Sequence, residues 1–325
     1  TPCSPTRTWP TSEQPKRADG DGRALDEAGR ILRASAPDRV RFGYRLAPLT
    51  SFRLGGPAAI YLEAESTDDL TAVARALHEA GVPLLVIGKG SNVLVSDDGF
   101  PGVVLRLGRS YRWAARDGDR LAAGGAMPLP ALAGVAFQHG LAGLEFGVAI
   151  PASLGGSVRM NAGAHGHSLD EVLEDVELFD LADERVRVVP VENAGFRYRD
   201  SALPDRGVVI GATVRLLAGD REDIRRRMDE ARAWRRATQP LAEPNCGSVF
   251  KNPPGDHAAR LIDAAGAKGL SVGGARVSEK HANFIVAAPG ASATDVHRLI
   301  VSLQERVRDR FGVDLEPEVR LVGDL

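Results

Sequence analysis

A strand–helix–strand pattern between residues 58 and 88 constrains the fold of this chain more than any other feature. Residues 58–64 (AAIYLEA) predict a strand, and residues 83–88 (PLLVIG) predict a second, buried strand. Between them, Ser66 and Asp69 have the spacing of a helix-capping pair, and Gly81 is typical of a helix end. The apolar side chains of this helix fall on one face, at Leu70, Val73, Ala74 and Leu77. We therefore predict a β-α-β unit.

The second strand ends in a glycine-rich loop, residues 88–92 (GKGSN), and a further strand is predicted at residues 103–107 (VVLRL). The loop fails the Rossmann fingerprint GxGxxG, because Val93 stands where the third glycine is required and no helix pattern follows. A glycine-serine turn can still present consecutive backbone N–H groups to a diphosphate. An ordinary tight turn is the alternative, and the loop alone does not decide between them.

Changes in composition indicate where the folded segments begin and end. Residues up to about Gly22 are rich in Pro, Ser, Thr and charge and predict a disordered leader, with a short helix following before Pro37. After Ala218 the sequence becomes charged and helical (DREDIRRRMDEARAWRRA), which we interpret as a domain junction. The predicted segments are residues 1–40 (leader and short helix), 41–108, 109–218 and 219–325.

The last two segments mix helices with strands, which predicts an α+β class. Residues 129–140 predict a helix that Gly140 stops, followed by strands at residues 175–181, 185–191 and 208–216. The final segment predicts a helix at residues 257–266, a strand at 281–288 and a terminal strand at 318–323. A last helix begins at a Ser292–Asp295 capping box, ends before Gly312 and carries an apolar stripe at Val296, Leu299, Ile300, Leu303, Val307 and Phe311.

Charge and cysteine content exclude several classes of protein. The formal net charge of −2 argues against a general nucleic-acid surface, which requires a basic excess. No apolar run approaches the roughly 20 residues that cross a bilayer, and the first residues lack the apolar core of a secretory signal. The two cysteines, Cys3 and Cys246, predict no disulfide framework. We expect a cytoplasmic protein.

A second glycine-rich stretch occupies residues 143–166 (GLEFGVAIPASLGGSVRMNAGAHG). Its composition disfavours both helix and strand and suits backbone that approaches a flat ligand closely. A crossover between domains is the alternative interpretation. Two glycine-rich loops separated by strands favour a dinucleotide ligand that carries a ring system.

Several polar side chains are candidates for chemistry. Arg197, Tyr198, Arg199 and Asp200 form either a surface charge cluster or a fixed guanidinium for a carboxylate or phosphate. Ser248, in NCGSVFKNP, lacks the GxSxG elbow of a nucleophile, although His257 and His281 could approach it in space. It is a turn residue by default, and it could be a general acid only toward a very basic acceptor such as a carbanion.

Two further groups are weaker candidates. Glu316 and Glu318 would share one face of the predicted terminal strand, where an exposed strand edge is the plain explanation. The spacing of His165, His167 and Asp170 does not match that of a known type of metal site, and we expect no bound metal.

Taken in order, these motifs resemble one family, UDP-N-acetylenolpyruvoylglucosamine reductase, also called UDP-N-acetylmuramate dehydrogenase (MurB). The similar stretches are TSFRLGGPA, VIGKGSNVLVSDDGFPGVVL, GLEFGVAIPASLGGSVRMNAGAHG, FRYRDS, GSVFKNP, AGAKGLSVGGARVSEKHANFIV and LEPEVRLVG, and they span residues 50–323. No tyrosine-bearing insertion lies between Arg199 and Ser248, as in the shorter type II form.

The resemblance implies a fold and cofactors. Residues 41–108 and 109–218 would form the two subdomains of an FAD-binding unit of the vanillyl-alcohol-oxidase (PCMH) type, and residues 219–325 a C-terminal α+β substrate-binding domain. NADPH would reduce the flavin, and UDP-N-acetylglucosamine enolpyruvate would then be reduced to UDP-N-acetylmuramate for peptidoglycan. No histidine lies between His78 and His139, so the FAD is expected to be non-covalent. We expect a monomer or a weak oligomer with no nucleic-acid or membrane partner.

The resemblance also implies residue roles. Hydride from flavin N5 would attack the enolpyruvyl methylene, Ser248 would donate the proton, and Arg199 and Glu318 would stabilise the charge on the substrate carboxylate. If Glu318 acts in its protonated form, the pKa of its carboxyl group should be raised. The residues expected to hold FAD are Gly88, Lys89, Gly90, Ser91, Asn92, Gly155, Gly156, Ser157, Asn161, Gly163 and Ala164. The residues expected to bind substrate are Tyr198, Arg235, Gln239, Lys251 and Asn252.

This chain departs from the family pattern at His165, where a tyrosine is common, and at Cys246, where an alanine is usual. The alternatives are another flavin oxidoreductase of the same fold and a non-catalytic flavin-binding paralogue. The joint presence of Ser248, Arg199 and Glu318 argues against both.

Overall fold

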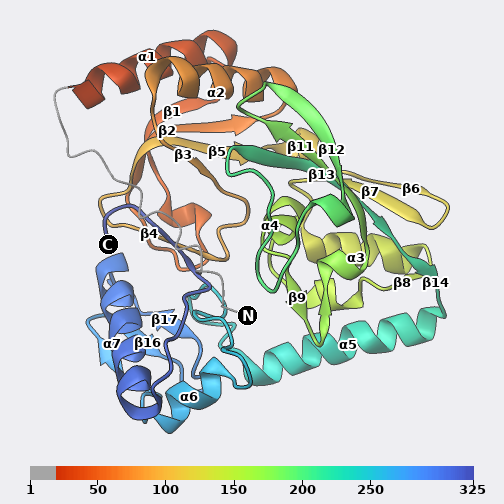
Figure 1. Ribbon diagram of the computed structural model, residues 1–325, viewed down its shortest axis with the longest axis vertical. Helices are drawn as coiled ribbons and strands as arrows, with labels where there is room; N and C mark the ends of the chain where they lie inside the picture. Colours follow the sequence, from red (N-terminus) through yellow and green to blue (C-terminus); the bar gives the residue numbers. More distant parts are fainter. Residues whose placement is uncertain (1–19) are drawn as a thin grey trace, which may run out of the picture.

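A computed structural model of the chain describes residues 20–325 and contains three groups of strands and helices (Figure 1). In the first group, a four-stranded sheet has β1 antiparallel to β2, and β2, β5 and β3 parallel to one another. Helices α1 and α2 pack against each other beside this sheet. The elements of this group are α1 (Gly20–Ser35), β1 (Val40–Arg45), β2 (Pro57–Ala64), α2 (Thr67–Ala80), β3 (Leu84–Val86) and β5 (Phe100–Leu107).

The predicted β-α-β unit is confirmed. The Ser66 side chain accepts a hydrogen bond from the Asp69 backbone N–H, and Gly81 ends α2 with a left-handed φ of 66°. The predicted apolar face of α2 is buried. The short helix before Pro37 is also confirmed as α1, which begins at Gly20, whereas residues 1–19 of the predicted leader lie outside the described residues.

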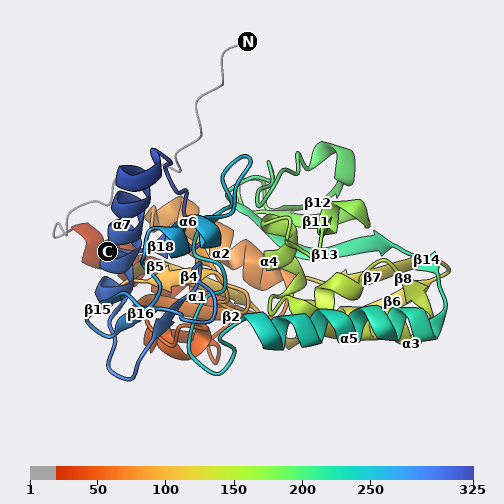
Figure 2. The ribbon, with the colours of Figure 1, turned by 90° about the horizontal axis from the view of Figure 1, so that it is seen from below.

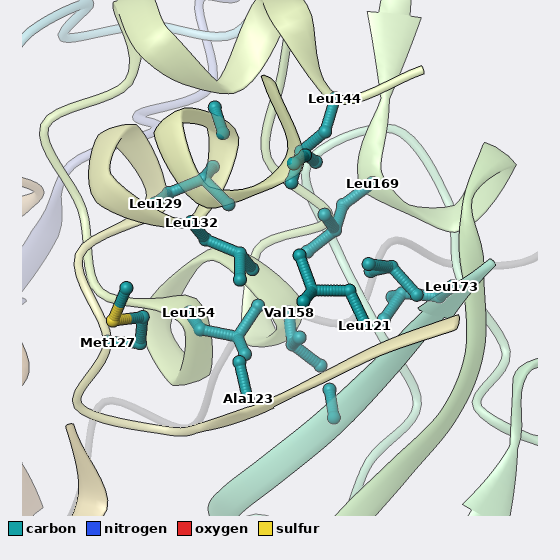
Figure 3. Close-up of a cluster of buried hydrophobic side chains, with 14 of the residues drawn as sticks. Leu121, Ala123, Met127, Leu129, Leu132, Leu144, Leu154, Val158, Leu169 and Leu173 are labelled. Atoms are coloured by element: carbon teal, nitrogen blue, oxygen red, sulfur yellow. The ribbon is translucent and has the colours of Figure 1, made fainter. Parts of the chain in front are cut away.

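The second group is an antiparallel five-stranded sheet in the order β12-β11-β13-β7-β6. Leucine and valine side chains from its strands and helices form one core (Figure 3). The elements are β6 (Ala114–Asp117), β7 (Arg120–Gly124), α3 (Leu129–Gln138), α4 (Leu154–Arg159), β11 (Leu173–Asp180), β12 (Arg185–Pro190) and β13 (Gly207–Arg215). There are also two short antiparallel strand pairs. Strand β8 (Leu141–Ala142) pairs with β14 (Leu217–Ala218), and β9 (Gly163–Ala164) pairs with β10 (His167–Ser168).

The expectation that residues 143–166 form neither helix nor strand is wrong over α4 and the β9–β10 hairpin. In α4, Leu154 and Val158 lie one helical turn apart and are fully buried in the second core. The Ser153 hydroxyl accepts the Gly156 N–H at the start of the helix. Tertiary burial and this cap outweigh the low helix propensity of the two glycines.

The third group combines a small sheet with helices. Its elements are α6 (Ala258–Ala264), β15 (Ser271–Val272), β16 (Ala275–Val277), β17 (Ile285–Ala287) and α7 (Ala293–Phe311). The Ser292–Asp295 capping box and the Gly312 end of α7 are confirmed. The long helix α5 (Arg221–Thr238) runs along the second group toward the third (Figure 2) and buries Ile224, Met228 and Ala231 in the second core.

Two long-range contacts join the third group to the first. Strand β18 (Arg320–Val322) pairs in parallel with β4 (Val93–Val95). The Asp97 carboxylate accepts hydrogen bonds from the backbone N–H groups of Ala293 (2.8 Å) and Thr294 (3.1 Å) at the start of α7. The terminal strand is thus confirmed, although it begins two residues after Glu318.

Short 3₁₀ turns connect these elements at Ala47–Leu49, Arg109–Tyr111, Glu145–Ala149, Leu169–Glu171 and Val191–Asn193. Over residues 20–325, no helix combines the length and the apolar character needed to cross a membrane. The predicted boundaries at residues 40, 108 and 218 stay predictions.

Replacing Asp97 by Ala should make the first turn of α7 open more easily by about 1–2 kcal/mol, because two N–H groups lose a charged acceptor. Hydrogen exchange of peptides that cover residues 293–300 should then be roughly 5- to 30-fold faster. Asp98→Ala, at the exposed neighbouring position, is the control. Equal acceleration in both variants would contradict the capping role.

Candidate active site

A cavity of about 350 Å³ takes its lining from both the first and the second group, a size suited to a small-molecule ligand. The predicted loop residues Gly88, Lys89, Gly155 and Gly156 all line it. The remaining lining includes Leu84, Val86, Ile87, Arg106, Leu107, Arg112, Gly125, Ala126, Ser153, Arg159, Asp205, Arg206, Gly207, Val208, Val209 and Arg320. The two glycine-rich segments therefore face one cavity, as a dinucleotide site requires.

Close approach of neighbouring atoms explains two glycines of the GKGSN loop. A Cβ on Gly88 would lie 2.3 Å from the Ser153 Oγ, so the GKGSN loop and the N-terminus of α4 touch. A Cβ on Gly90 would lie 2.0 Å from the Leu49 carbonyl oxygen, and its φ of 61° is left-handed. Gly90 is thus required by the loop's own packing, and it does not line the cavity.

Arginines dominate the charge of the cavity. Five of them line it, against the single carboxylate of Asp205: Arg106, Arg112, Arg159, Arg206 and Arg320. Arg159 is held by a 2.8 Å hydrogen bond to the Leu203 carbonyl and another to the Gly207 carbonyl. Guanidinium groups fixed in this way suit phosphate oxygens. Sequence reasoning missed these residues, although Arg159 and Arg320 lie inside the motifs SVRMN and EVRLVG.

One orphaned polar atom supports a ligand near α4. Ser157, a predicted FAD residue, is buried, and its Oγ has no hydrogen-bond partner among the described residues. An unpaired buried hydroxyl is costly. Ser157 directly follows Gly156, which lines the cavity, and the glycine backbone and arginines of that lining suit the phosphates of FAD.

The other predicted FAD residues make contacts within the protein. Asn161 is buried, donates to the Arg197 carbonyl (3.1 Å) and accepts from the Asp170 N–H (3.1 Å). The Asn92 amide donates to the Glu318 carbonyl at 2.9 Å. Among the described residues, Ser91 lies outside the cavity lining, and Gly163 and Ala164 form β9.

The predicted catalytic pair, Arg199 and Glu318, is in direct contact. Arg199 Nε lies 3.1 Å from Glu318 Oε1, and Arg199 Nη2 donates to the Gly163 carbonyl at 2.8 Å. Arg199 adopts a left-handed φ of 56° inside a tight turn closed by the Arg197–Asp200 backbone pair. Such a conformation costs an arginine about 1–3 kcal/mol and is typical of functional sites.

Ser248 is brought beside this pair by the backbone. The carbonyl of its neighbour Val249 accepts the Glu318 N–H at 2.7 Å, and Phe250 bridges to Pro317. Glu316 and Glu318, predicted to share one face of a strand, differ in exposure. The Glu316 side chain is 63% exposed and pairs with Lys251, whereas that of Glu318 is 16% exposed. Residues 316–318 run antiparallel to residues 249–251, with Pro317 opposite Phe250, before β18 begins.

Burial raises the pKa of the Glu318 carboxyl, and the neighbouring Arg199 and Lys251 oppose this only in part. The protonated form is therefore favoured relative to an exposed glutamic acid. Burial also raises the pKa of the Cys246 thiol, with the Glu318 charge adding to the effect. The raised pKa of Glu318 agrees with the expectation from the sequence.

The predicted substrate residues fall into two sets. The Tyr198 hydroxyl accepts the Asn252 N–H at 3.4 Å, and Lys251 Nζ lies 2.7 Å from Glu316 Oε1, so Tyr198 contacts the segment that runs from Ser248 to Asn252. Arg235 Nε donates to Gln239 Oε1 at 3.1 Å near the end of α5. Gln239 lines a second cavity of about 490 Å³.

His165 lies at the tip of the β9–β10 hairpin, with its ring 5.0 Å from the ring of Trp234 on α5. His167 Nδ1 lies 2.8 Å from Glu171 Oε2. In the part of the chain that the structure describes, no cluster of three or more His, Cys, Asp or Glu side chains could hold a metal ion.

Comparisons with known proteins give one consistent family. The model for an FAD binding domain matches residues 58–189, and that for the UDP-N-acetylenolpyruvoylglucosamine reductase C-terminal domain matches residues 239–322. The reductase of that name from Heliobacterium modesticaldum is 46% identical over 278 residues, covering 85% of this chain and 88% of the relative. That of Methylorubrum extorquens (strain PA1) is 45% identical over 296 residues, covering 90% and 95%. The crystal structure of UDP-N-acetylenolpyruvylglucosamine reductase (MurB) from Thermus caldophilus superposes with a TM-score of 0.75 at 36% identity, covering 87% of this chain and 98% of that one.

The partly buried carboxyl of Glu318 predicts a specific pH dependence of stability. Its pKa is raised in the folded state, so its contribution to stability is fully present below the unfolded pKa, near 4.5, and is lost as the pH rises through the folded pKa. Glu318→Gln removes this loss, since the amide does not ionise. The melting temperature of the variant minus that of the wild type should therefore increase as the pH rises from about 4.5. A difference that stays constant or falls with rising pH would contradict the raised pKa.

Proposed function

Because this chain belongs to the UDP-N-acetylenolpyruvoylglucosamine reductase family, we propose that it reduces UDP-N-acetylglucosamine enolpyruvate to UDP-N-acetylmuramate. It does so as an FAD-dependent oxidoreductase with NADPH as reductant, and the reaction supplies peptidoglycan synthesis. The fold expected from the sequence, an FAD-binding unit followed by a C-terminal α+β domain, is confirmed by the two matching family models. A cytoplasmic location and a monomeric or weakly oligomeric state are proposed with it.

One observation carries the assignment of the reacting site. The partly buried Arg199–Glu318 pair lies beside the Ser248 segment, and Arg320, two residues after Glu318, lines the arginine-rich cavity. The proposed proton donor and the charge-stabilising residues therefore adjoin the cavity proposed for FAD.

Gly88, Gly155, Gly156 and the arginines that line the cavity would hold FAD, which would supply the transfer of a hydride from NADPH to the enolpyruvyl group. The chain's own residues stabilise the negative charge on the substrate carboxylate and supply the proton. Arg199 presents its guanidinium to the substrate carboxylate, where negative charge develops when the adjacent carbon gains electrons. Glu318 is poised by its raised pKa to donate a hydrogen bond to the same carboxylate in its protonated form.

Ser248 completes the reaction by donating its hydroxyl proton to the carbon next to the carboxylate. A serine hydroxyl is a weak acid, and it suits this step because a carbanion-like carbon is a strong base. The resulting alkoxide recovers a proton from solvent.

The overall reaction can be followed in two halves. The purified protein should show a flavin spectrum, lose the flavin colour under NADPH without oxygen, and regain it rapidly when UDP-N-acetylglucosamine enolpyruvate is added. Recovery with oxygen alone would indicate a different oxidoreductase. A protein that stays colourless after addition of FAD would be a protein without flavin function.

Ser248→Ala should leave NADPH-driven bleaching nearly unchanged and should slow reoxidation by the enolpyruvyl sugar by at least about 100-fold, equivalent to about 3 kcal/mol of barrier. The split is expected because only the second half-reaction needs a proton on carbon. Stopped-flow absorbance measures both rates. Cys246→Ala, two residues earlier, is the control and should change neither. Equal losses in the two halves would remove Ser248 from the proposed role.

A further inference from the structure

Asn283 is a buried polar residue that the reaction proposed above does not use. It lies between β16 and β17 in the motif SEKHANFIV, and it is 4% exposed. All three of its polar groups beyond its own N–H face the segment that follows Ser248. Its backbone carbonyl accepts the Val249 N–H (2.9 Å), its Oδ1 accepts the Phe250 N–H (2.9 Å), and its Nδ2 donates to the Phe250 carbonyl (2.8 Å).

The Asn283 side chain thus replaces the peptide group of a neighbouring strand. A side-chain amide offers the same donor and acceptor as a backbone peptide, at one fixed spacing. The Phe250 side chain is 1% exposed, so its N–H and carbonyl would be buried without partners if this amide were absent.

The opposite edge of the same segment is held by the residues around Glu318. The Val249 carbonyl accepts the Glu318 N–H at 2.7 Å, and the Lys251 N–H donates to the Glu316 carbonyl at 2.9 Å. On the other side of Ser248, Gly247 has a left-handed φ of 83° and open space around its Cβ position. The position of the Ser248 hydroxyl is therefore set mainly by residues 249–250, which are clamped between Asn283 and Glu318.

We infer that Asn283 is a positioning residue for the proton donor: its amide fixes Val249 and Phe250, and through them the Ser248 hydroxyl relative to Arg199 and Glu318. The inference rests on the proposed function, since it assigns Asn283 to the proton-transfer half of that reaction. Asn283 itself does not contact the reacting atoms.

The test separates this role from plain core stability by a double-mutant cycle in the flavin-loaded enzyme. Asn283→Ala should leave NADPH bleaching within about twofold of wild type and slow reoxidation by the enolpyruvyl sugar by about 10- to 100-fold. In a Ser248→Ala background the same change should slow reoxidation by less than about threefold, because the group it positions is gone. Val296→Ala, in the same hydrophobic core on α7, is the control and should slow neither half selectively.

Asn283→Asp provides a second variant that keeps the size of the side chain. When protonated, the new carboxyl can accept from the Phe250 N–H and donate to the Phe250 carbonyl, whereas the ionised form places an anionic oxygen against that carbonyl. The ratio of its reoxidation rate to that of the wild type should therefore rise as the pH falls. A change confined to stability would leave this ratio independent of pH.

Three results would overturn the inference: full additivity of Asn283→Ala with Ser248→Ala, equal slowing of both half-reactions, or the same selective slowing in Val296→Ala. Failure of the proposed function itself looks different, because wild-type enzyme would then not be reoxidised by the enolpyruvyl sugar. That result would overturn both proposals. If reoxidation and the Ser248→Ala effect are both observed while the cycle is additive, only the role of Asn283 fails.

Discussion

The site depends on one clasp between segments that lie 226 residues apart. The Asn92 side-chain amide donates to the Glu318 carbonyl, and the Asn92 backbone carbonyl accepts at 3.0 Å from the N–H of Arg320, where β18 begins to pair with β4. This clasp places Arg320 in the wall of the cavity and Glu318 against Arg199. It also sets the edge along which the Ser248 segment runs. These contacts therefore connect the arginine-rich cavity to the partly buried Arg199–Glu318 ion pair.

The arginine-rich cavity and the Arg199–Glu318 site, which these contacts join, differ in their electrostatics. The cavity collects five arginines and one carboxylate, a balance that favours phosphate. Next to it, burial favours a protonated Glu318 and leaves Arg199 as the neighbouring fixed cation. The left-handed backbone of Arg199 holds that cation by a strained turn, so its direction is fixed before any substrate arrives. Preorganised charge of this kind is what transition-state stabilisation requires.

Local sequence signals predicted the elements well, and long-range contacts account for most of what was missed. Some signals lie within a single helix and can be predicted from the local sequence. They are the caps at Ser66 and Ser292 and the apolar stripes of α2 and α7. Helix α4 was not, because its stability comes from burying Leu154 and Val158 in a distant core. Arg199, Ser248 and Glu318 were identified by resemblance, whereas their roles stay predictions. Arg159, Arg320 and Asn283 were overlooked because only the folded chain shows where their hydrogen-bonding groups point.

The β4–β18 pair also has a consequence for the order in which the protein folds. During synthesis the glycine loop and β4 emerge first, and they wait for more than two hundred further residues before their parallel partner exists. Closing so long a loop is entropically costly and contributes to slow folding. The nascent chain can therefore complete its β-α-β unit and its antiparallel sheet early, while the reacting centre is assembled only in the last step.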